Sequence, residues 1–378
     1  MKIELHILQN FAPSCLNRDD TNSPKECEFG GCRRARISSQ CVKRAIRWAP
    51  VFAEKTAAEP SKRTRLLKEN LAKRLEKRKL GQPEQIGRVL GEAIPALLTK
   101  LDKKGLTDVG IYLGPGEIAA FEQQLADRWP DLAGDKPKEA LGEAHKELSK
   151  LFKDGVTSAP DVALYGRMLA SKAGVKIHVD AACQVAHAIS THKVGVEFDF
   201  FTAVDDLQPK EDPGAGMMGT VELNSACYYR YANIDLEQLK SNLGDDEGLA
   251  RKTVEAFLRA AVAAIPTGKQ NSMAAQNPPS FVFGVVRDNG LWSLANAFVD
   301  PVRAGKDGDL VDSSVARLES YWERLVEVYG DSGIREKCAV GLNSRKPTVL
   351  PRAKNFEELV KKVMAALAFR PNQGGAGK

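Results

Sequence analysis

The sequence has no apolar run that approaches the length of about 18 residues that a membrane-spanning helix needs. Residues 1–10 alternate apolar with polar or charged side chains, so they also lack the continuous apolar core of a secretory signal peptide. These absences argue against a secreted or membrane-embedded chain. We therefore expect a cytoplasmic protein without a membrane partner.

Paired cysteines are missing as well. The seven cysteines form no CxxC motif and are scattered from position 15 to position 338. An odd and scattered set argues against the disulfide framework of a secreted domain and predicts reduced thiols. The chain also lacks the GxxxxGK pattern of a phosphate-binding loop and the HExxH pattern of a zinc hydrolase, so we predict no cofactor.

Two groups of residues nevertheless have the chemistry of metal ligands. Cys27, Cys32 and Cys41 form the first group, but their spacing is irregular and no fourth ligand follows. The second group consists of His178, Cys183, His187 and His192. If this segment is helical, Cys183 and His187 share one face, yet no established metal-binding pattern results. The sequence therefore predicts no metal site.

Acidic residues are absent from residues 29–53, whereas the same stretch contains six cations. They are Arg33, Arg34, Arg36, Lys43, Arg44 and Arg47. The net charge of all 378 residues is only +6, so nucleic-acid binding must be inferred from where charge gathers and not from its total. This local excess adjoins Gly30 and Gly31, where a backbone can approach a partner closely, and it makes nucleic acid the leading partner class.

The second half of this stretch predicts a helix of about ten residues. Ser38 or Ser39 can cap its first turn, and Pro50 disfavours helical geometry at Ala49. The face with cations and hydrogen-bonding groups contains Gln40, Lys43, Arg44 and Arg47. The opposite, apolar arc contains Cys41, Val42, Ala45, Ile46, Trp48 and Ala49. A merely solvated helix is the alternative, but no acidic residue stands at ion-pairing spacing, which favours an anionic partner.

The remaining chain predicts a mixture of strands and helices. Residues 2–8 alternate apolar and polar side chains, as in a strand with one buried and one exposed face. Residues 54–155, rich in Lys, Glu, Arg and Leu, predict a helical insertion that includes a helix at 62–79. Residues 194–203 and 220–234 predict a protruding hairpin with a Pro- and Gly-rich tip. Later expected elements are a helix at 250–265, a strand at 281–287, and helices at 314–328 and 356–369.

A set of short motifs occurs in a fixed order along the chain. They are SCLNRDD (14–20), FGGxRRxRISSQ (29–40), KRA (43–45), GRM (166–168), AHAIxTH (186–192), FTAVDDLQ (201–208), MGT (218–220), YRYANI (229–234) and ANAF (295–298). Together they resemble the CasC family, the CRISPR RNA-binding backbone subunit of the type I-E Cascade complex. The resemblance covers most of the chain and is weak in residues 55–160 and beyond 330.

The resemblance implies an α+β fold shaped like a right hand, with a ferredoxin-like (RRM-like) palm, helical fingers and a protruding thumb. The implied boundaries are 1–54, 176–194 and 223–378 for the palm, 55–175 for the fingers and 195–222 for the thumb hairpin.

The implied function is that of a non-catalytic subunit. Copies of it coat the guide RNA (crRNA) as a helical filament, hold its phosphate backbone and present its bases for pairing with invading target DNA. The implied partners are the guide RNA, target DNA through the guide, other copies of the chain, other Cascade subunits and a separate helicase-nuclease. Backbone contacts carry no base information, so one protein can accept any guide sequence.

The resemblance also implies which residues bind RNA. They are Arg18, Lys25, Arg34, Ser39, Gln40, Lys43, Arg44, Arg47, Arg167, Met168, Phe201 and Met218. Among them, Arg18 and Lys25 with Lys43, Arg44 and Arg47 are expected to hold phosphates. Met168 and Met218 are expected to bracket a displaced nucleotide, and some relatives carry Leu at the Met218 position.

Two alternatives remain open at this point. Asp19 and Asp20 could hold a metal-activated water, which would make the chain a metal-dependent endoribonuclease. We instead expect them to shape their loop, with a possible ion pair to Arg18 or Arg36. The other alternative is a stand-alone RRM-like RNA-binding protein that does not assemble with copies of itself.

Overall fold

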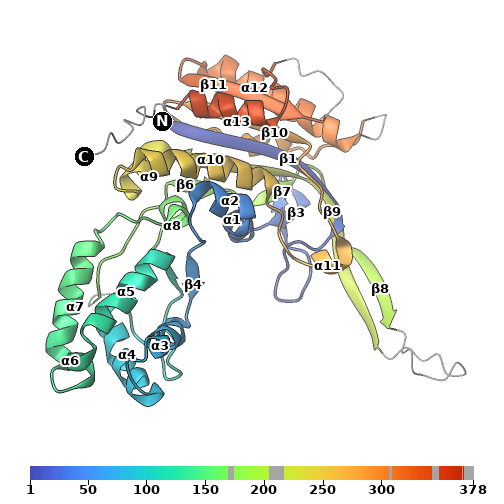
Figure 1. The fold of residues 1–378 in the computed structure, drawn as a ribbon. Coiled ribbons are helices and arrows are strands. Elements are labelled where there is room, and N and C mark those ends of the chain that lie inside the picture. The colour runs from blue at the N-terminus through green and yellow to red at the C-terminus, as the bar shows by residue number, and fades with distance from the viewer. Residues whose placement is uncertain (169–173, 204–216, 306–308, 343–348, 368, 370–378) are drawn as a thin grey trace, which may run out of the picture. The chain divides into compact units, whose positions relative to one another are not determined.

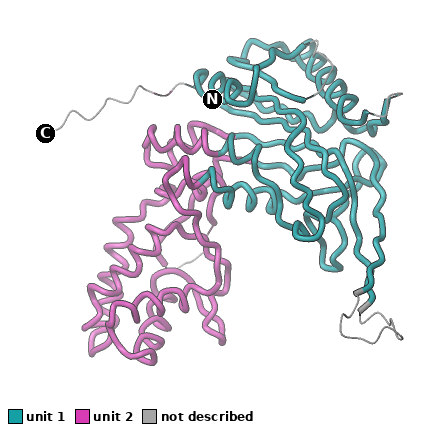
Figure 2. Tube along the Cα trace, turned by 45° about the vertical axis from the view of Figure 1, so that its right-hand side comes forward, with its two compact units in different colours: residues 1–52, 185–233, 257–368 teal, residues 53–184, 234–256, 369–378 magenta. Residues whose placement is uncertain are grey.

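The computed structural model describes residues 1–168, 174–203, 217–305, 309–342, 349–367 and 369, and it divides the chain into two compact units (Figure 1, Figure 2). Unit 1 comprises residues 1–52, 185–233 and 257–368, and unit 2 comprises residues 53–184, 234–256 and 369–378. Each unit is thus assembled from segments that are far apart in the sequence.

Unit 1 is built on an antiparallel sheet with the strand order β11-β10-β1-β9-β7-β3-β2, and β8 pairs with β9 beside it. Its strands are β1 (Lys2–Ser14), β2 (Glu26–Phe29), β3 (Cys32–Ile37), β7 (Ala188–Ser190), β8 (Glu197–Ala203), β9 (Met217–Asp235), β10 (Phe281–Arg287) and β11 (Ile334–Gly341). The mixed α+β class is confirmed, and the ferredoxin-like assignment remains a prediction.

Helices cover both faces of this sheet. Those that begin in unit 1 are α1 (Ser39–Trp48), α2 (Pro50–Thr56), α11 (Gln270–Met273), the 3₁₀ helix η1 (Leu294–Phe298), α12 (Leu310–Tyr329) and α13 (Phe356–Ala365). On one face, Leu5 and Ile7 of β1 line a small cavity together with Val42 and Ile46 of α1. On the other face, η1 and α12 pack with β1, β9 and β10 in one apolar cluster. The sheet is therefore the middle layer of three.

The expectation of one exposed face for the first strand is wrong. β1 runs to Ser14, and Glu4 and His6 are fully buried. Alternation alone could not reveal this, because η1 and α12, which cover the polar side of β1, come from nearly 300 residues further along the chain. Glu4 accepts hydrogen bonds from the Tyr231 hydroxyl (2.7 Å) and the Trp292 amide (2.6 Å), so its burial is compensated.

His6 lies among aromatic rings in the same cluster. Its Nδ1 is 2.9 Å from the Tyr229 hydroxyl, and its ring centroid is 5.1 Å from that of Tyr231 and 5.4 Å from that of Phe283. Burial, reinforced by the charge of Arg287, lowers the pKa of His6 to about 3. The imidazole is therefore neutral in the folded protein at neutral pH.

Unit 2 is mainly helical, as expected for residues 54–155. Its elements are β4 (Lys62–Thr64), α3 (Leu67–Lys77), α4 (Pro83–Leu97), β5 (Ile111–Leu113), α5 (Pro115–Asp127), α6 (Trp129–Ala133), α7 (Pro137–Leu151), α8 (Pro160–Tyr165) and α9 (Leu236–Asn242). Two further elements cross the border between the units: β6 (Cys183–Val185) ends in unit 1, and α10 (Glu247–Ala263) continues into it. The helix expected at 62–79 starts later, because residues 62–64 pair with β5 as a strand. Helices α3 to α7 share one apolar cluster.

Other expected elements agree with the structure to within a few residues. The strand at 281–287 and the two arms of the hairpin are confirmed. The helices expected at 250–265, 314–328 and 356–369 are confirmed as α10, α12 and α13. The hairpin tip, residues 204–216, lies outside the described residues. No helix among the described residues has the length and apolar character that crossing a membrane requires.

Acidification should destabilise unit 1 through His6. The unfolded histidine takes up a proton near pH 6.5 but the folded one only near pH 3, so the unfolded state binds more protons between these values. His6 therefore contributes a loss of about 1.4 kcal/mol per pH unit as pH falls through this window. Urea unfolding at pH 7, 6, 5 and 4 should show a shallower pH dependence in His6→Phe than in the parent.

Burial raises the pKa of neighbouring Glu4, which gives the opposite pH dependence, but Glu4 is present in both proteins and does not enter the difference. Parallel pH profiles for parent and His6→Phe would contradict the buried, neutral histidine.

Candidate nucleic-acid interface

Helix α1 presents the expected cationic face. The Ser38 side chain accepts a hydrogen bond from the Cys41 amide (3.3 Å), which confirms the predicted cap, and the helix ends at Trp48 before Pro50. Gln40 and Arg44 are exposed, and Lys43 and Arg47 are half-buried.

The opposite side of α1 is held by the core, since Val42 and Ile46 are buried. Trp48 was expected on this apolar arc but is 48 % exposed, with the Arg44 guanidinium 6.0 Å from the centroid of its ring. Trp48 therefore extends the exposed side of the helix with an aromatic surface that the sequence did not predict.

The loop before β2 is shaped by Asp19, as expected. Asp19 Oδ1 accepts hydrogen bonds from the Thr21 amide (2.9 Å), the Thr21 hydroxyl (2.8 Å) and the Ser23 amide (3.0 Å). The hydrogen bond from the Thr21 hydroxyl is the main reason that the pKa of Asp19 is lowered. The expected ion pair to Arg18 or Arg36 is not formed: Arg18 donates to Asn22, and Arg36 to the Glu26 carbonyl and His187.

Asn17 joins this loop to α1, a role that the sequence analysis missed. Its side-chain carbonyl accepts from the Ser38 amide (2.8 Å), and its backbone carbonyl accepts from the Lys25 amide (2.9 Å). Exposed Arg18 follows Asn17 directly. Arg18 and Lys25 in this loop are thus held near the N-terminus of α1, the helix that contains the other residues expected to bind phosphate.

Arg34 is a correction to the expected RNA-binding set. It is 0 % exposed, and its guanidinium donates to four backbone carbonyls. These are Phe29 O (3.2 Å), Ser190 O (3.2 Å), Phe298 O (2.8 Å) and Val299 O (3.1 Å). Its donors hold the β2–β3 hairpin against η1, so we remove Arg34 from the proposed contacts.

The neighbouring FGG segment explains why glycine stands there. Gly30 has φ +61°, and a Cβ atom on it would lie 1.9 Å from the Val299 carbonyl oxygen. The glycine therefore serves close packing within unit 1, and the expectation that it lets a ligand approach is wrong.

The register of the β8–β9 hairpin places Phe201 and Met218, which were both predicted to bind RNA, on different faces. Phe201 pairs with Gly219, and Met218 pairs with the next residue, Thr202, so the Phe201 and Met218 side chains point to opposite faces of the ribbon. A Cβ on Gly219 would lie 2.6 Å from the Phe201 ring, which shows that this ring lies over the glycine.

Phe198 and Phe200 instead share the Met218 face. All three are strongly exposed, at 71 %, 64 % and 67 %. Exposed aromatic side chains on a two-stranded ribbon are suited to stacking against flat partners. Neither phenylalanine was among the predicted contacts, although the alternating pattern EFDF (197–200) was a signal for one shared face.

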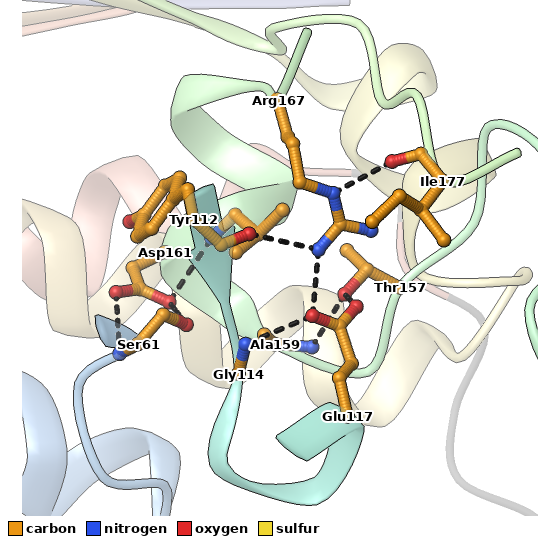
Figure 3. A network of polar contacts seen from close by, with 10 residues as sticks. Ser61, Tyr112, Gly114, Glu117, Thr157, Ala159, Asp161, Arg167 and Ile177 are labelled. Atoms are coloured by element: carbon orange, nitrogen blue, oxygen red, sulfur yellow. Dashed lines mark hydrogen bonds and ion pairs between the residues drawn. The ribbon is translucent and has the colours of Figure 1, made fainter. Parts of the chain in front are cut away.

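In unit 2, Met168 and Arg167 have opposite surroundings. Met168 is 84 % exposed, whereas Arg167 is buried and forms an ion pair with Glu117 (2.6 Å; Figure 3). Because it is buried, the Arg167 guanidinium is not accessible to a phosphate, and we remove it from the proposed RNA contacts as well.

The two metal-ligand groups are not supported. Cys183 and His187 do not share a helix face, because residues 183–185 and 188–190 form strands β6 and β7 and no helix spans this segment. All seven cysteines are free. Among the described residues, no three His, Cys, Asp or Glu side chains are arranged so that they could hold a metal ion.

Comparisons with known proteins agree on one group. The family model described as "CT1975-like protein" matches residues 3–362. A chain of a solved structure described as "CRISPR RNA-guided surveillance complex, pre-nicking" is 32 % identical, with a TM-score of 0.81 over 97 % of this chain and 100 % of that one. A second, described as "CRISPR RNA-guided surveillance complex", is 27 % identical, with a TM-score of 0.62 over 97 % and 99 %. Among curated proteins, none matches.

The two adjacent serines provide a test of the α1 geometry. Ser38→Ala removes the side-chain acceptor of the Cys41 amide and should lower the free energy of unfolding by about 1 kcal/mol. Ser39→Ala is the matched control, since Ser39 lies inside the helix, and it should leave the urea midpoint nearly unchanged. Equal midpoints for the two variants would contradict the assigned cap.

Proposed function

Because the chain belongs to the CT1975-like protein family, we propose that it is a non-catalytic backbone subunit of a CRISPR RNA-guided surveillance complex. The observation that carries this proposal is the 32 % identity to a surveillance-complex chain over 97 % of the sequence, with a TM-score of 0.81. A match that spans both compact units supports the same role for the whole chain and not for one domain alone.

In this role the subunit holds the guide RNA by its phosphates. The supporting observation is electrostatic: residues 29–53 contain no acidic residue, and α1 directs Gln40 and Arg44 to solvent while its apolar side is buried. The proposed contacts, after the two corrections, are Arg18, Lys25, Ser39, Gln40, Lys43, Arg44 and Arg47. Arginine forks suit phosphate oxygens, and phosphate contacts fix the path of the strand without reading its sequence.

Exposed methionines provide the second kind of contact. We propose that Met168 and Met218 each act as an apolar wedge and bracket a nucleotide displaced from the stack of RNA bases. Phe201 contacts the same RNA strand. Unstacking costs a few kcal/mol, which contacts to the backbone on either side offset. Met168 is 84 % exposed and Met218 is 67 % exposed, so both side chains are accessible to a nucleic-acid partner, which supports such a role.

The finer proposal is a type I-E Cascade assembly. Copies of the chain contact one another head to tail along the guide RNA in a filament that does not close. The other Cascade subunits complete the assembly, guide bases pair with target DNA, and a separate helicase-nuclease performs the cutting. Sequence is then read by base pairing and not by this subunit.

An endoribonuclease centred on Asp19 and Asp20 has less support. One carboxylate oxygen of Asp19 already accepts three hydrogen bonds from its own loop, so it is committed to holding that loop.

Loss of one phosphate contact should change the salt dependence of RNA binding. Arg44→Gln should reduce the slope of log K against log salt by about 0.7 for single-stranded RNA, because one fewer phosphate is neutralised. The loss should be the same for guide RNAs of different sequence. Fluorescence anisotropy with two unrelated guides at several salt concentrations measures both quantities.

Arg33→Gln is the matched control, since Arg33 is also exposed but pairs with Glu26 (2.8 Å) across the β2–β3 hairpin. Its slope should equal that of the parent. Equal slope changes in Arg33→Gln and Arg44→Gln, or an Arg44→Gln effect confined to one guide, would contradict backbone binding by α1.

A further inference from the structure

The two residues that precede Met168 are held by several close contacts. Arg167, its neighbour, forms an antiparallel bridge with Val179 through two backbone hydrogen bonds of 2.8 and 2.9 Å. Gly166 has φ +75°, and a Cβ there would lie 2.8 Å from the Ala181 amide nitrogen. The backbone just before Met168 is therefore packed too closely to accept any other residue at position 166 without movement.

The Arg167 side chain, which is buried, supplies a second anchor through polar contacts with its surroundings (Figure 3). Its Nε donates to the Ile177 carbonyl (2.6 Å), and its Nη1 donates to the Tyr112 carbonyl (3.0 Å) and to Glu117 Oε2 (2.6 Å). These partners come from β5, α5 and the segment after residue 174. Arg167 thus ties the chain beside Met168 to three separate parts of unit 2.

Glu117 is held as firmly as Arg167. Its Oε2 also accepts from the Gly114 amide (2.8 Å), and its Oε1 accepts from the Thr157 hydroxyl (2.9 Å). The side chains of Glu117 and Arg167 are only 4 % and 2 % exposed. The pair is therefore almost completely removed from water.

Stability alone is a poor explanation for this ion pair. Burying two charges costs about as much as their attraction returns, so apolar residues often serve a fold equally well. In addition, Nη2 of Arg167 is buried without a hydrogen-bond partner among the described residues, which a purely stabilising contact would avoid. What the contacts do provide is a fixed position for the Arg167 side chain, whose residue directly precedes Met168 in the chain.

We propose that the buried Glu117–Arg167 ion pair is a positioning device that holds exposed Met168 in place as a wedge against nucleic acid. The proposal rests on the proposed function and deepens it. Arg167 then acts through Met168 and does not itself contact RNA. Because the methionine side chain is itself flexible, the backbone that carries it must be fixed, since a shift of about 1 Å is enough to spoil a functional contact.

The test uses two glutamates of helix α5. Glu117→Gln keeps the size of the side chain but removes the charge opposite Arg167. Glu122→Gln is the matched control: Glu122 is 9 % exposed and pairs with Arg74 (2.9 Å) and Arg78 (2.6 Å), none of which is among the contacts that hold residues 166–168. Both variants lose a buried negative charge from the same helix.

The first measurement needs no RNA. The chain has six methionines, so methyl NMR of protein labelled at the methionine methyl groups gives few signals, and Met168→Leu identifies that of Met168. Glu117→Gln should shift or broaden the Met168 signal, and Glu122→Gln should leave it unchanged. An unchanged Met168 signal in folded Glu117→Gln would overturn the proposal.

A second variant guards against loss of folding. Glu117→Leu combined with Arg167→Met replaces the pair by apolar side chains of similar length, which a core tolerates better than one unpaired charge. Four buried polar groups that bond to the pair lose those bonds, so the thermal midpoint should fall; below that midpoint, where the variant is folded, the Met168 signal should differ from that of the parent. A parent-like signal in this double variant would also overturn the proposal.

The second measurement connects position to function. Guide RNAs carrying 2-aminopurine at successive positions should fluoresce most where a base is displaced, and Met168→Ala should remove that maximum. Glu117→Gln should lower it to nearly the same level, with no further loss when it is combined with Met168→Ala, because both changes act through one side chain. Glu122→Gln should retain it.

The outcomes distinguish failure of the Met168 wedge from failure of the positioning role alone. A maximum that survives Met168→Ala would overturn the wedge of the proposed function together with this proposal. A maximum lost in Met168→Ala but kept in Glu117→Gln would overturn the positioning role alone and leave the wedge standing.

Discussion

The burial of the Arg34 guanidinium is the interaction on which the proposed interface depends. A buried cation must find hydrogen-bond acceptors, and Arg34 finds four backbone carbonyls from three regions of unit 1. They fix strand β3 against η1 and β7. Because β3 ends one residue before the Ser38 cap, fixing the strand also fixes where α1 begins and which way its cations point.

The chain uses arginine in two distinct ways. Arg34 and Arg167 are interior residues that hydrogen-bond within the protein. Arg18 and Arg44 instead extend into solvent beside a loop and helix held by Asn17 and Ser38. The buried arginines organise the framework, and the exposed ones are left to meet an anion. In both units a buried cation thus lies close in sequence to the surface residues that we assign to RNA.

Sequence predicted what local chemistry determines. The bounds of α1 follow from a serine cap and Pro50, and β10 follows from an apolar run that ends in a turn, so both were found. Features that depend on contacts between distant parts of the chain were not predicted. Burial of His6 depends on helices far along the chain, and residues 183–185 and 188–190 become strands by pairing within a sheet. Likewise, nothing in the RR and GRM motifs shows that one arginine of each is internal.

The central claim is that this chain recognises the charged backbone of RNA and not its bases. Fluorescence anisotropy can compare three ligands of one guide length: the natural RNA, an RNA of unrelated sequence, and the natural sequence with neutral methylphosphonate linkages. The account predicts equal affinity for the first two and loss of binding for the third. Retained binding to the neutral backbone, or strong discrimination between the two natural sequences, would contradict it.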